Sequence, residues 1–172
     1  MNLRITSLAL ALALTASTAW GHGDEKHKPS QVEPGRETAG AVLSVAAEAE
    51  DAVAALERFS AALSADDLSA AGAELDPSVL ILESGGAERT RDEYLGGHAK
   101  HDAEFLKAAH TTLQRRVAQA SGDLVWVGSE SEIHASRGDK MLMISSTETA
   151  VLRKTAQGWK IVHIHWSSRA QK

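Results

Sequence analysis

The sequence predicts an α+β fold in which N-terminal helices cover one face of a curved antiparallel sheet. Residues 45–110 are rich in Ala and show helical periodicity, whereas residues 111–169 are rich in Val, Ile, Thr and Trp and are divided by short turns. Helices followed by a run of strands is the order typical of this class. The length of 172 residues and the hydrophobic content of 43% favour one globular domain.

The first 21 residues have the layout of a cleaved secretory signal. Arg4 precedes an apolar run of about a dozen residues, and small residues follow at Ala19 and Gly21. Neither this run nor any later segment reaches the ~20 apolar residues that a membrane span needs. Residues 22–44 contain two of the three prolines and several charges, which predicts a flexible leader. We therefore expect a periplasmic or secreted protein with its domain at residues 45–169.

Cysteine content bears on how the domain is stabilised, and charge bears on its possible partners. The chain has no cysteine, so the exported domain must be stabilised by packing without disulfides. Its formal net charge is −5, and we find no basic cluster of the kind that binds nucleic acid. We expect no nucleic-acid partner.

The helical half of the domain divides into three segments. Val53, Leu56 and Leu63 recur at helical spacing in residues 45–67 and predict an amphipathic helix. Asp66 or Asp67 can cap a second, short helix that ends before Pro77. A third helix is expected from about Arg91 to His110, with a kink or a break at Gly96 and Gly97.

Strands account for the rest of the domain. Residues 78–84 read as a strand followed by a Gly-Gly turn and a short return strand at 87–89. Thr90 and Glu93 then have the spacing of a capping box, which marks the start of the third helix. Four β-rich runs follow at residues 111–121, 124–136, 141–154 and 159–169, and the short turns between them predict an antiparallel meander.

The order of these elements, with "SVLILESGGAERTRDEYLGGHAKHDAEF" in the middle and "VLRKTAQGWKIVHIHWSSR" at the end, resembles the SnoaL-like branch of the nuclear transport factor 2-like superfamily. The resemblance implies a cystatin-like cone, with a bent sheet wrapped round the N-terminal helices, a pocket at the wide end, and a homodimer. The superfamily includes isomerases, cyclases, dehydratases and non-catalytic binding or assembly modules. Its ketosteroid isomerases use an Asp base with an oxyanion hole made by a Tyr and a protonated Asp. The only tyrosine here is Tyr94, and we find no matching set around it.

The last strand holds two histidines among apolar residues. A period of two puts His163 and His165 on one face with Trp159 and Ile161. In the cone, this face is expected to point inward, with the two histidines at the pocket. The opposite face is then expected to form the homodimer contact through Val162, Ile164 and Trp166.

A second group of potential metal ligands lies in "HAKHD". His98, His101 and Asp102 share one face of a helix at i, i+3 and i+4. If that face meets the pocket, His98 and Asp102 approach His163 and His165, which is a donor set suited to zinc or another divalent metal. The alternative is that these histidines are ordinary solvated or hydrogen-bonded residues, because no spacing here matches a strong metal motif.

The leader suggests a separate copper site. Cleavage after Ala19 exposes Trp20-Gly21-His22, and cleavage after Gly21 makes His22 the first residue. Either start offers amine, amide or imidazole nitrogens to copper.

Other polar residues have two interpretations. Glu130 lies on one strand face with Glu132 and His134, and it is either a pocket base or part of a solvated face. The hydroxyl-rich stretch at 145–149 is either a polar pocket wall or ordinary strand surface. Tyr94 and Trp126 are further candidates for the pocket lining, whereas Arg115 and Arg116 read as a simple charge pair.

Three functions are consistent with this pattern. The first is an exported SnoaL-like domain that binds a small molecule in a histidine-lined pocket. The second is an isomerase, dehydratase or hydrolase that uses a His or Glu as acid or base, with or without a metal. The third is a structural dimerisation module. A pocket with inward polar groups favours the first two, and one filled by Trp126, Phe105 and Leu side chains favours the third.

Overall fold

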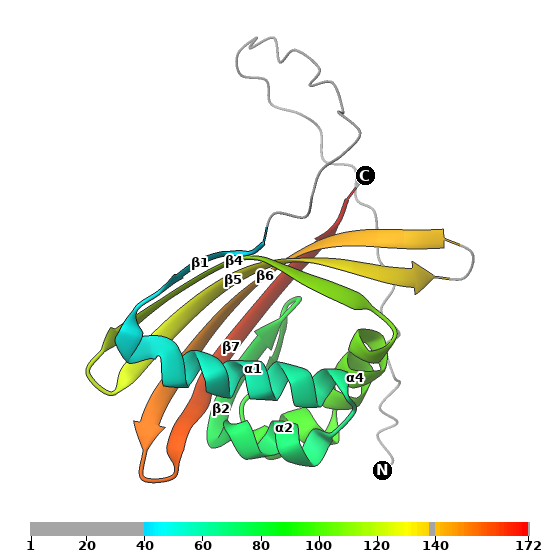
Figure 1. Cartoon of the computed structure of the whole chain (residues 1–172). Coiled ribbons are helices and arrows are strands. Elements are labelled where there is room, and N and C mark those ends of the chain that lie inside the picture. Colours follow the sequence, from blue (N-terminus) through cyan, green and yellow to red (C-terminus); the bar gives the residue numbers. More distant parts are fainter. Residues whose placement is uncertain (1–39, 138–139, 172) are drawn as a thin grey trace, which may run out of the picture. The chain divides into compact units, whose positions relative to one another are not determined.

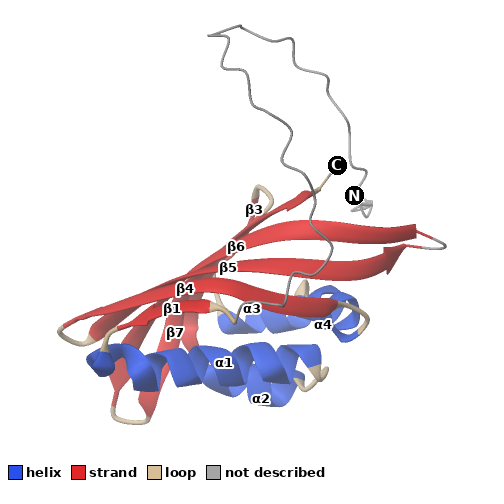
Figure 2. Ribbon diagram, turned by 45° about the horizontal axis from the view of Figure 1, so that its top comes forward, coloured by secondary structure: helices blue, strands red, loops and turns tan. Residues whose placement is uncertain are grey.

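Seven strands form one curved sheet in the computed structural model, which describes residues 40–137 and 140–171 (Figure 1). The strand order is β1-β4-β5-β6-β7-β2-β3, so β1 and β3 are the two edges. Figure 2 shows the helices gathered on one face of this sheet. The predicted α+β architecture is therefore confirmed. The predicted signal peptide and most of the predicted leader lie outside the described residues.

The helices begin and end close to the predicted signals. Helix α1 covers Glu50–Ser64 after a 3-10 turn at Ala47–Ala49, and α2 covers Leu68–Glu74. Asp67 caps α2 by accepting a hydrogen bond from the backbone N–H of Ala70. Thr90 caps α3, Arg91–Gly96, in the same way through the N–H of Glu93. The expected break at Gly96 and Gly97 is present, because a separate helix α4 covers Ala99–Lys107.

The four predicted strands form the centre of the sheet. Strands β4 (His110–Ser121), β5 (Leu124–Arg137), β6 (Lys140–Thr155) and β7 (Gly158–Ala170) pair antiparallel in sequence order. Gly122 and Gly158 have positive φ angles in the turns before β5 and β7, a conformation that glycine adopts without steric cost. The meander was thus predictable from turn residues and β propensity alone.

Three further strands flank the meander. Strand β2, Leu75–Glu83, lies parallel to β7, and β3, Gly86–Glu88, returns antiparallel to β2. At the opposite edge, β1, Val42–Val45, pairs in parallel with β4. The sequence did not predict β1, and its first three residues fall in the segment predicted to be a flexible leader.

Two bulges change which way the strand residues point. In β7, Ile161 pairs with Leu152 and His163 pairs with Val151, so Val162 is an extra residue between adjacent positions of β6. In β4 the register also shifts between Leu113 and Arg115. An extra residue reverses the alternation of side chains beyond it. Residues on the two sides of Val162 therefore follow opposite parity.

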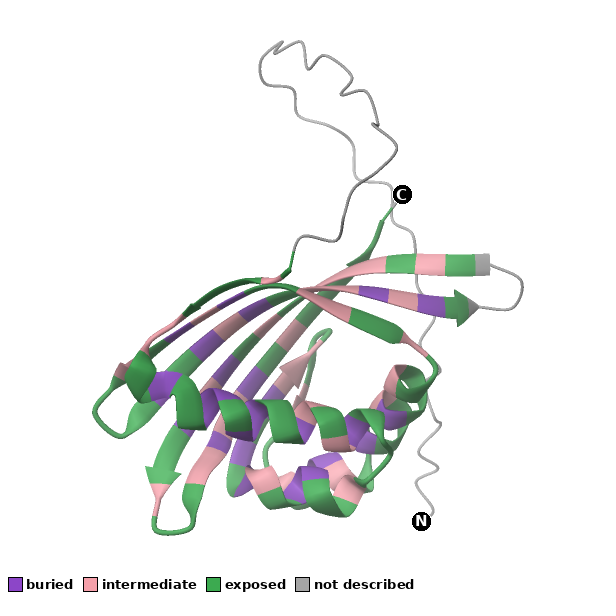
Figure 3. Cartoon of the chain, viewed as in Figure 1, coloured by how far each residue is buried: buried purple, intermediate pink, exposed green. Residues whose placement is uncertain are grey.

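The core lies between α1 and the concave face of the sheet. Leu56, Phe59 and Leu63 of α1 are almost fully buried, and they belong to the same cluster as Leu152 and Ile164. Figure 3 shows buried residues on the helix face that meets the sheet and at alternating positions along the strands. Ala52 and Ala55 are also buried, and their small side chains suit a close approach of α1 to the sheet.

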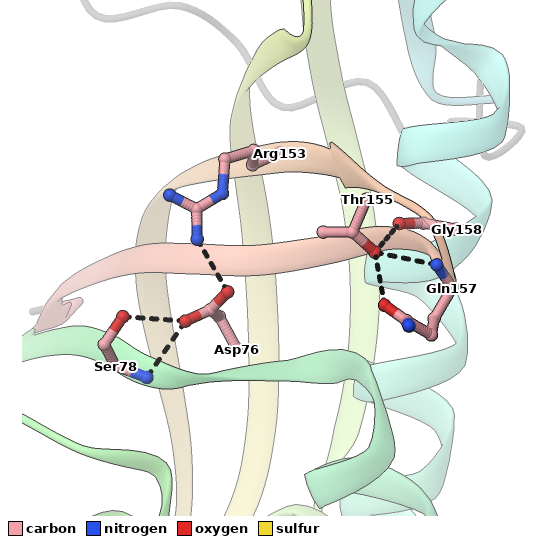
Figure 4. Close-up of polar contacts among 6 residues, drawn as sticks. All are labelled: Asp76, Ser78, Arg153, Thr155, Gln157 and Gly158. Carbon is pink, nitrogen blue, oxygen red and sulfur yellow. Dashed lines mark hydrogen bonds and ion pairs between the residues drawn. The ribbon is translucent and has the colours of Figure 1, made fainter.

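A buried acidic residue joins β2 to β6. Asp76 is 8% exposed and accepts hydrogen bonds from the backbone N–H and the hydroxyl of Ser78 at 2.9 and 2.7 Å. Arg153 donates to its other oxygen at 2.8 Å (Figure 4). The bonds from Ser78, followed by those from Arg153, hold the pKa of Asp76 below its usual value. Asp76 is therefore a fully bonded structural carboxylate.

No helix among the described residues has the length and apolar character needed to cross a bilayer.

Candidate functional site

A cavity of about 400 Å³ lies between the C-terminal half of α1, helix α4 and the concave face of the sheet. Apolar walls come from α1 and α4, through Phe59, Leu63, Phe105 and Leu106. The floor is formed by β4, β5, β6 and β7 towards the end of the sheet that lies near α4 (Figure 1). A cavity of this size suits a small organic molecule.

One row of side chains crosses the floor of the cavity from strand to strand. Arg116 of β4 pairs with Ser129 of β5, Ser129 with Glu148 of β6, Glu148 with Trp166 of β7, and Trp166 with Glu83 of β2. All five residues line the cavity. Directly opposite residues on neighbouring strands are close enough for their side chains to interact.

Hydrogen bonds link four members of this row. The Arg116 guanidinium donates to Ser129 Oγ at 3.2 Å and to Glu57 of α1 at 2.7 Å. Glu148 accepts from Ser129 Oγ at 3.3 Å and from the Trp166 indole N–H at 2.9 Å. Trp166 also stacks on Phe59, with ring centroids 6.4 Å apart. These contacts fix the row in place and satisfy Arg116 and Ser129, which are both buried.

The next row outward explains why a cavity forms here. Ser131, Ser146 and Ser168 lie opposite one another on β5, β6 and β7, and all three line the cavity. At the other end of the same face the corresponding positions hold large aliphatic residues such as Leu152 and Ile161. Serine side chains are too short to reach the helices, so this part of the sheet is left unfilled.

A second polar group lies where α3, α4 and the β2–β3 hairpin meet. The buried Tyr94 hydroxyl donates to Asp102 Oδ2 at 2.8 Å, and Asp102 lines the cavity. His98 Nδ1 and Glu88 Oε1 are hydrogen-bonded nearby. Glu83 ends β2 at the same place and also lines the cavity. The sequence places these groups through the cap at Thr90 and the break between α3 and α4.

The two cavity carboxyls of this group are both harder to ionise than usual. Burial is the main cause that raises the pKa of Glu83, and the charge of Asp102 adds to it. Burial likewise raises the pKa of Asp102, against the opposing effects of the bond from Tyr94 and of His98. Burial, with the charge of Asp102, also raises the pKa of Tyr94 far above its usual value. Tyr94 is therefore a hydrogen-bond donor at any physiological pH.

The structure places the two β7 histidines on the opposite face from the one predicted. Ile164 is fully buried and Trp166 stacks in the core, whereas His165 is exposed on the outer face. His163 is hydrogen-bonded through Nδ1 to the carbonyl of Leu80 at 2.8 Å. The cause is the bulge at Val162, which reverses the alternation read from the sequence. Neither histidine lines the cavity.

The other predicted pocket residues also lie outside the lining. Trp126 is 43% exposed on the outer face, and Glu130 is exposed beside Arg115, 3.7 Å away. Tyr94 and His98 do not line the cavity. The Tyr94 hydroxyl is hydrogen-bonded to Asp102, which does line it. Of the individual residues predicted to line the pocket or bind a metal, only Asp102 lines the cavity, and Ser146 and Glu148 of the stretch at 145–149 line it as well.

The predicted metal site is not assembled. Because of the bulge at Val162, His163 and His165 lie on the outer face of the sheet, whereas Asp102 lies at the cavity on the concave side. Within residues 40–137 and 140–171, no three His, Asp or Glu side chains are grouped so that they could hold a metal ion. The copper site predicted at Trp20-Gly21-His22 lies outside the described residues.

The predicted dimer surface needs the same correction. Ile164 and Trp166 point into the core, so they cannot form the outer contact. The third predicted contact residue, Val162, is the extra residue of the bulge. The row that does cross the outer face is Trp126, Val151, His163 and Leu80. Leu80 is 38% exposed, so this face is partly apolar.

Sequence reasoning passed over most of the residues that line the cavity. Glu83 carries no motif in the sequence, and Arg116 reads there only as half of a charge pair. Ser146 and Glu148 belong to the hydroxyl-rich stretch whose interpretation was left open. A signal was available there: Ser146, Glu148 and Ala150 alternate along one strand and share a face with the core.

Known proteins place this fold in a class. A structure from Novosphingobium aromaticivorans, described as NTF2-like with a cystatin-like fold, matches with a TM-score of 0.59 at 13% identity, covering 68% of this chain and 79% of that one. The fold is therefore that of the nuclear transport factor 2-like class. The family model of the SnoaL-like domain matches residues 52–171, and the chain belongs to this family.

Two further solved structures are similar to this chain. A candidate ketosteroid isomerase from Shewanella frigidimarina is 30% identical, with a TM-score of 0.65, covering 74% of this chain and 100% of that one. The hub of a CaMKII from S. rosetta is 23% identical, with a TM-score of 0.64, covering 72% of this chain and 98% of that one. No sequence among curated proteins matches the chain.

Proposed function

We propose that this chain is an exported SnoaL-like domain that binds a small molecule in the cavity between α1, α4 and the sheet. The observation that carries the proposal is the row of three serines, which leaves an apolar-walled space of about 400 Å³ beside bonded polar groups. A purely structural module has no need for such a space, because a void of this size forfeits packing energy.

Filling the cavity tests this proposal. Ser146→Trp places an indole in the space, whereas Thr147→Trp places the same group on the outer face of the same strand. We expect the uncharged dye Nile red to bind the wild type and Thr147→Trp with similar affinity, and Ser146→Trp at least about ten-fold more weakly. Equal dye binding by all three proteins, each checked for folding by circular dichroism, contradicts the proposal.

A second candidate function is proton transfer in the same cavity. It is favoured by the pair Glu83 and Asp102, because burial raises the pKa of both carboxyls and so makes each a stronger proton acceptor than an exposed carboxylate. The 30% identity to a candidate ketosteroid isomerase gives a first substrate class to try. Tyr94 fixes the orientation of Asp102 through its hydrogen bond.

Isomerisation of a β,γ-unsaturated ketosteroid, followed by absorbance, tests the second candidate. If Asp102 is the base, Asp102→Asn lowers kcat by at least about a hundred-fold, and wild-type activity rises with pH through the raised pKa of Asp102. Glu130→Gln on the outer face serves as the control. Turnover that does not exceed the rate without protein excludes this reaction.

Export of the domain rests on the pattern of residues 1–21. We expect the protein in a Gram-negative host to accumulate in the periplasm without these residues. N-terminal sequencing of the fractionated protein checks this, and an intact Met1 in the cytoplasmic fraction contradicts it.

A homodimer through the outer sheet face completes the proposal. Trp126 and Leu80 are large exposed apolar residues at the two ends of one row across β5, β6, β7 and β2. A copy of the same face would cover them. Analytical sedimentation should give a dimer for the wild type and a monomer for Trp126→Glu. A wild-type monomer at micromolar concentration contradicts the proposed homodimer.

A further inference from the structure

The charges in the cavity are unbalanced. Its lining holds three carboxylates, Glu83, Asp102 and Glu148, and one guanidinium, Arg116. Arg116 is already paired with Glu57 at 2.7 Å, so it does not neutralise the other three. Two of those three, Glu83 and Asp102, sit together at the α4 side of the cavity; burial raises the pKa of both, and the charge of Asp102 adds to the rise at Glu83.

Three donors beside the carboxylates of the site are bonded to the protein, whereas the hydroxyls of Ser131, Ser146 and Ser168 line the floor as further donors or acceptors. The guanidinium of Arg116 donates to Ser129 and Glu57, the indole N–H of Trp166 donates to Glu148, and the hydroxyl of Tyr94 donates to Asp102. Each is held there by a bond between 2.7 and 3.2 Å. These bonds direct the three groups toward side chains of the protein itself.

Acceptors, by contrast, exceed the donors that reach them. An ionised carboxylate offers about four lone-pair sites. Asp102 receives one side-chain hydrogen bond, from Tyr94, and Glu148 receives two, from Ser129 and Trp166. Among the described residues, Glu83 receives no side-chain hydrogen bond. A ligand with hydrogen-bond donors therefore matches this end of the cavity.

We propose that the cavity takes an organic cation: an amine whose ammonium group lies between Glu83 and Asp102 and whose apolar body lies along Phe59, Phe105 and Leu106. This inference rests on the proposed binding function and adds the chemical class of the ligand. An ammonium group supplies three donors and a positive charge, which match the surplus acceptors and the negative charge of that end. The apolar walls of α1 and α4 account for the rest of the molecule.

Proton uptake at the site gives the proposal a second consequence. Glu83 faces Asp102, Glu88 and His98, and Asp102 also faces Tyr94 and His101. Because burial raises the pKa of both carboxyls, they lose their charge at a higher pH than exposed carboxyls do. Amine binding should therefore weaken as the pH falls from neutral, before ordinary carboxylates begin to titrate.

A matched series of probes tests the ligand class. Naphthalenemethylamine, naphthalenemethanol and naphthoate share one apolar body and differ in a cationic, neutral or anionic head. Displacement of Nile red from the purified mature chain should show the amine binding at least about ten-fold more tightly than naphthoate, with the alcohol between them. Glu83→Gln and Asp102→Asn should each weaken amine binding about ten-fold and change alcohol binding less than about two-fold.

The controls separate this inference from the proposed function. Glu130→Gln removes a carboxylate from the outer face and should leave the affinity for the amine unchanged. If naphthoate binds as tightly as the amine, or if neither variant affects the amine, the ligand class is wrong while the binding pocket stands. If Nile red itself does not bind, the proposed function fails first.

Discussion

Strand β2 carries an acidic residue near each end, and the two have opposite properties. Asp76, near the start, is bonded to Ser78 and Arg153, and these bonds lower its pKa. Glu83, at the end, faces the cavity beside Asp102, and burial raises its pKa. One strand thus spans a closed end, where both oxygens of Asp76 are bonded within the protein (Figure 4), and an open end, where Glu83 faces the cavity.

The two ends of the sheet differ in which side chains face the helices. At the closed end, aliphatic residues such as Leu152 and Ile161 reach α1 and exclude water. At the open end, a bonded polar row and then a row of three serines form the floor of the cavity, with Ile133 and Ile144 beyond them. The boundary between the two ends runs through Trp166, which stacks on Phe59 and donates to Glu148.

The largest effect is expected at the closed end. Asp76→Ala removes the acceptor of Ser78 and Arg153, and we expect it to lower the free energy of unfolding by about 2 kcal/mol at neutral pH. Chemical denaturation measures this. Because the folded pKa of Asp76 is lowered, its contribution is present above the pKa of the unfolded state and is lost as the pH falls through the folded pKa.

Asp92→Ala is the matched control for that variant. Asp92 is 84% exposed and pairs with Arg91 at the surface, so its loss should change stability by less than about 1 kcal/mol. Equal effects of the two substitutions would show that Asp76 is no more structural than a surface acid.

A smaller effect is expected at the boundary. Trp166→Phe keeps an aromatic ring against Phe59 but removes the donor to Glu148, and we expect a loss of about 1 kcal/mol. Trp126→Phe makes the same change on the outer face and should cost less. If thermal unfolding ranks the two variants in the reverse order, the polar row does not stabilise the fold.

The smallest effect, with the opposite sign, is expected at the open end. The pKa of Glu83 is raised in the folded state, so its charge destabilises the fold above that pKa, and the effect disappears below the unfolded value. Glu83→Gln should therefore raise stability near pH 7 by less than about 1 kcal/mol, after allowance for solvent screening. Its advantage over the wild type should vanish in acid. A variant that is less stable at pH 7 contradicts the assignment.

Local signals predicted the fold well because each acts over a few residues. Thr90 caps α3 as expected, Asp67 is the one of the two expected residues that caps α2, and Gly96 and Gly97 divide α3 from α4. The turns at Gly122 and Gly158 set the meander. Such signals depend on backbone conformation, which a short stretch of sequence largely determines.

The site was predicted poorly because it depends on one inserted residue and on contacts far apart in the chain. The bulge at Val162 has no signature in its own sequence, yet it moves His163 and His165 to the outer face and brings Trp166 inside. The row from Arg116 to Glu83 spans five strands, and only the register shows that its members are neighbours. Periodicity within one strand cannot supply that information.

The most direct test of the contrast is a carboxyl titration by carbon-13 NMR of the purified mature chain. The structure predicts that Glu83 and Asp102 titrate above the usual values of their residue types and that Asp76 titrates below its own. It also predicts that naphthalenemethylamine lowers the pKa of Glu83 and Asp102 and leaves that of Asp76 unchanged, because only the first two face the cavity. Ordinary or lowered pKa values for both Glu83 and Asp102 would contradict the account of an open, acceptor-rich end.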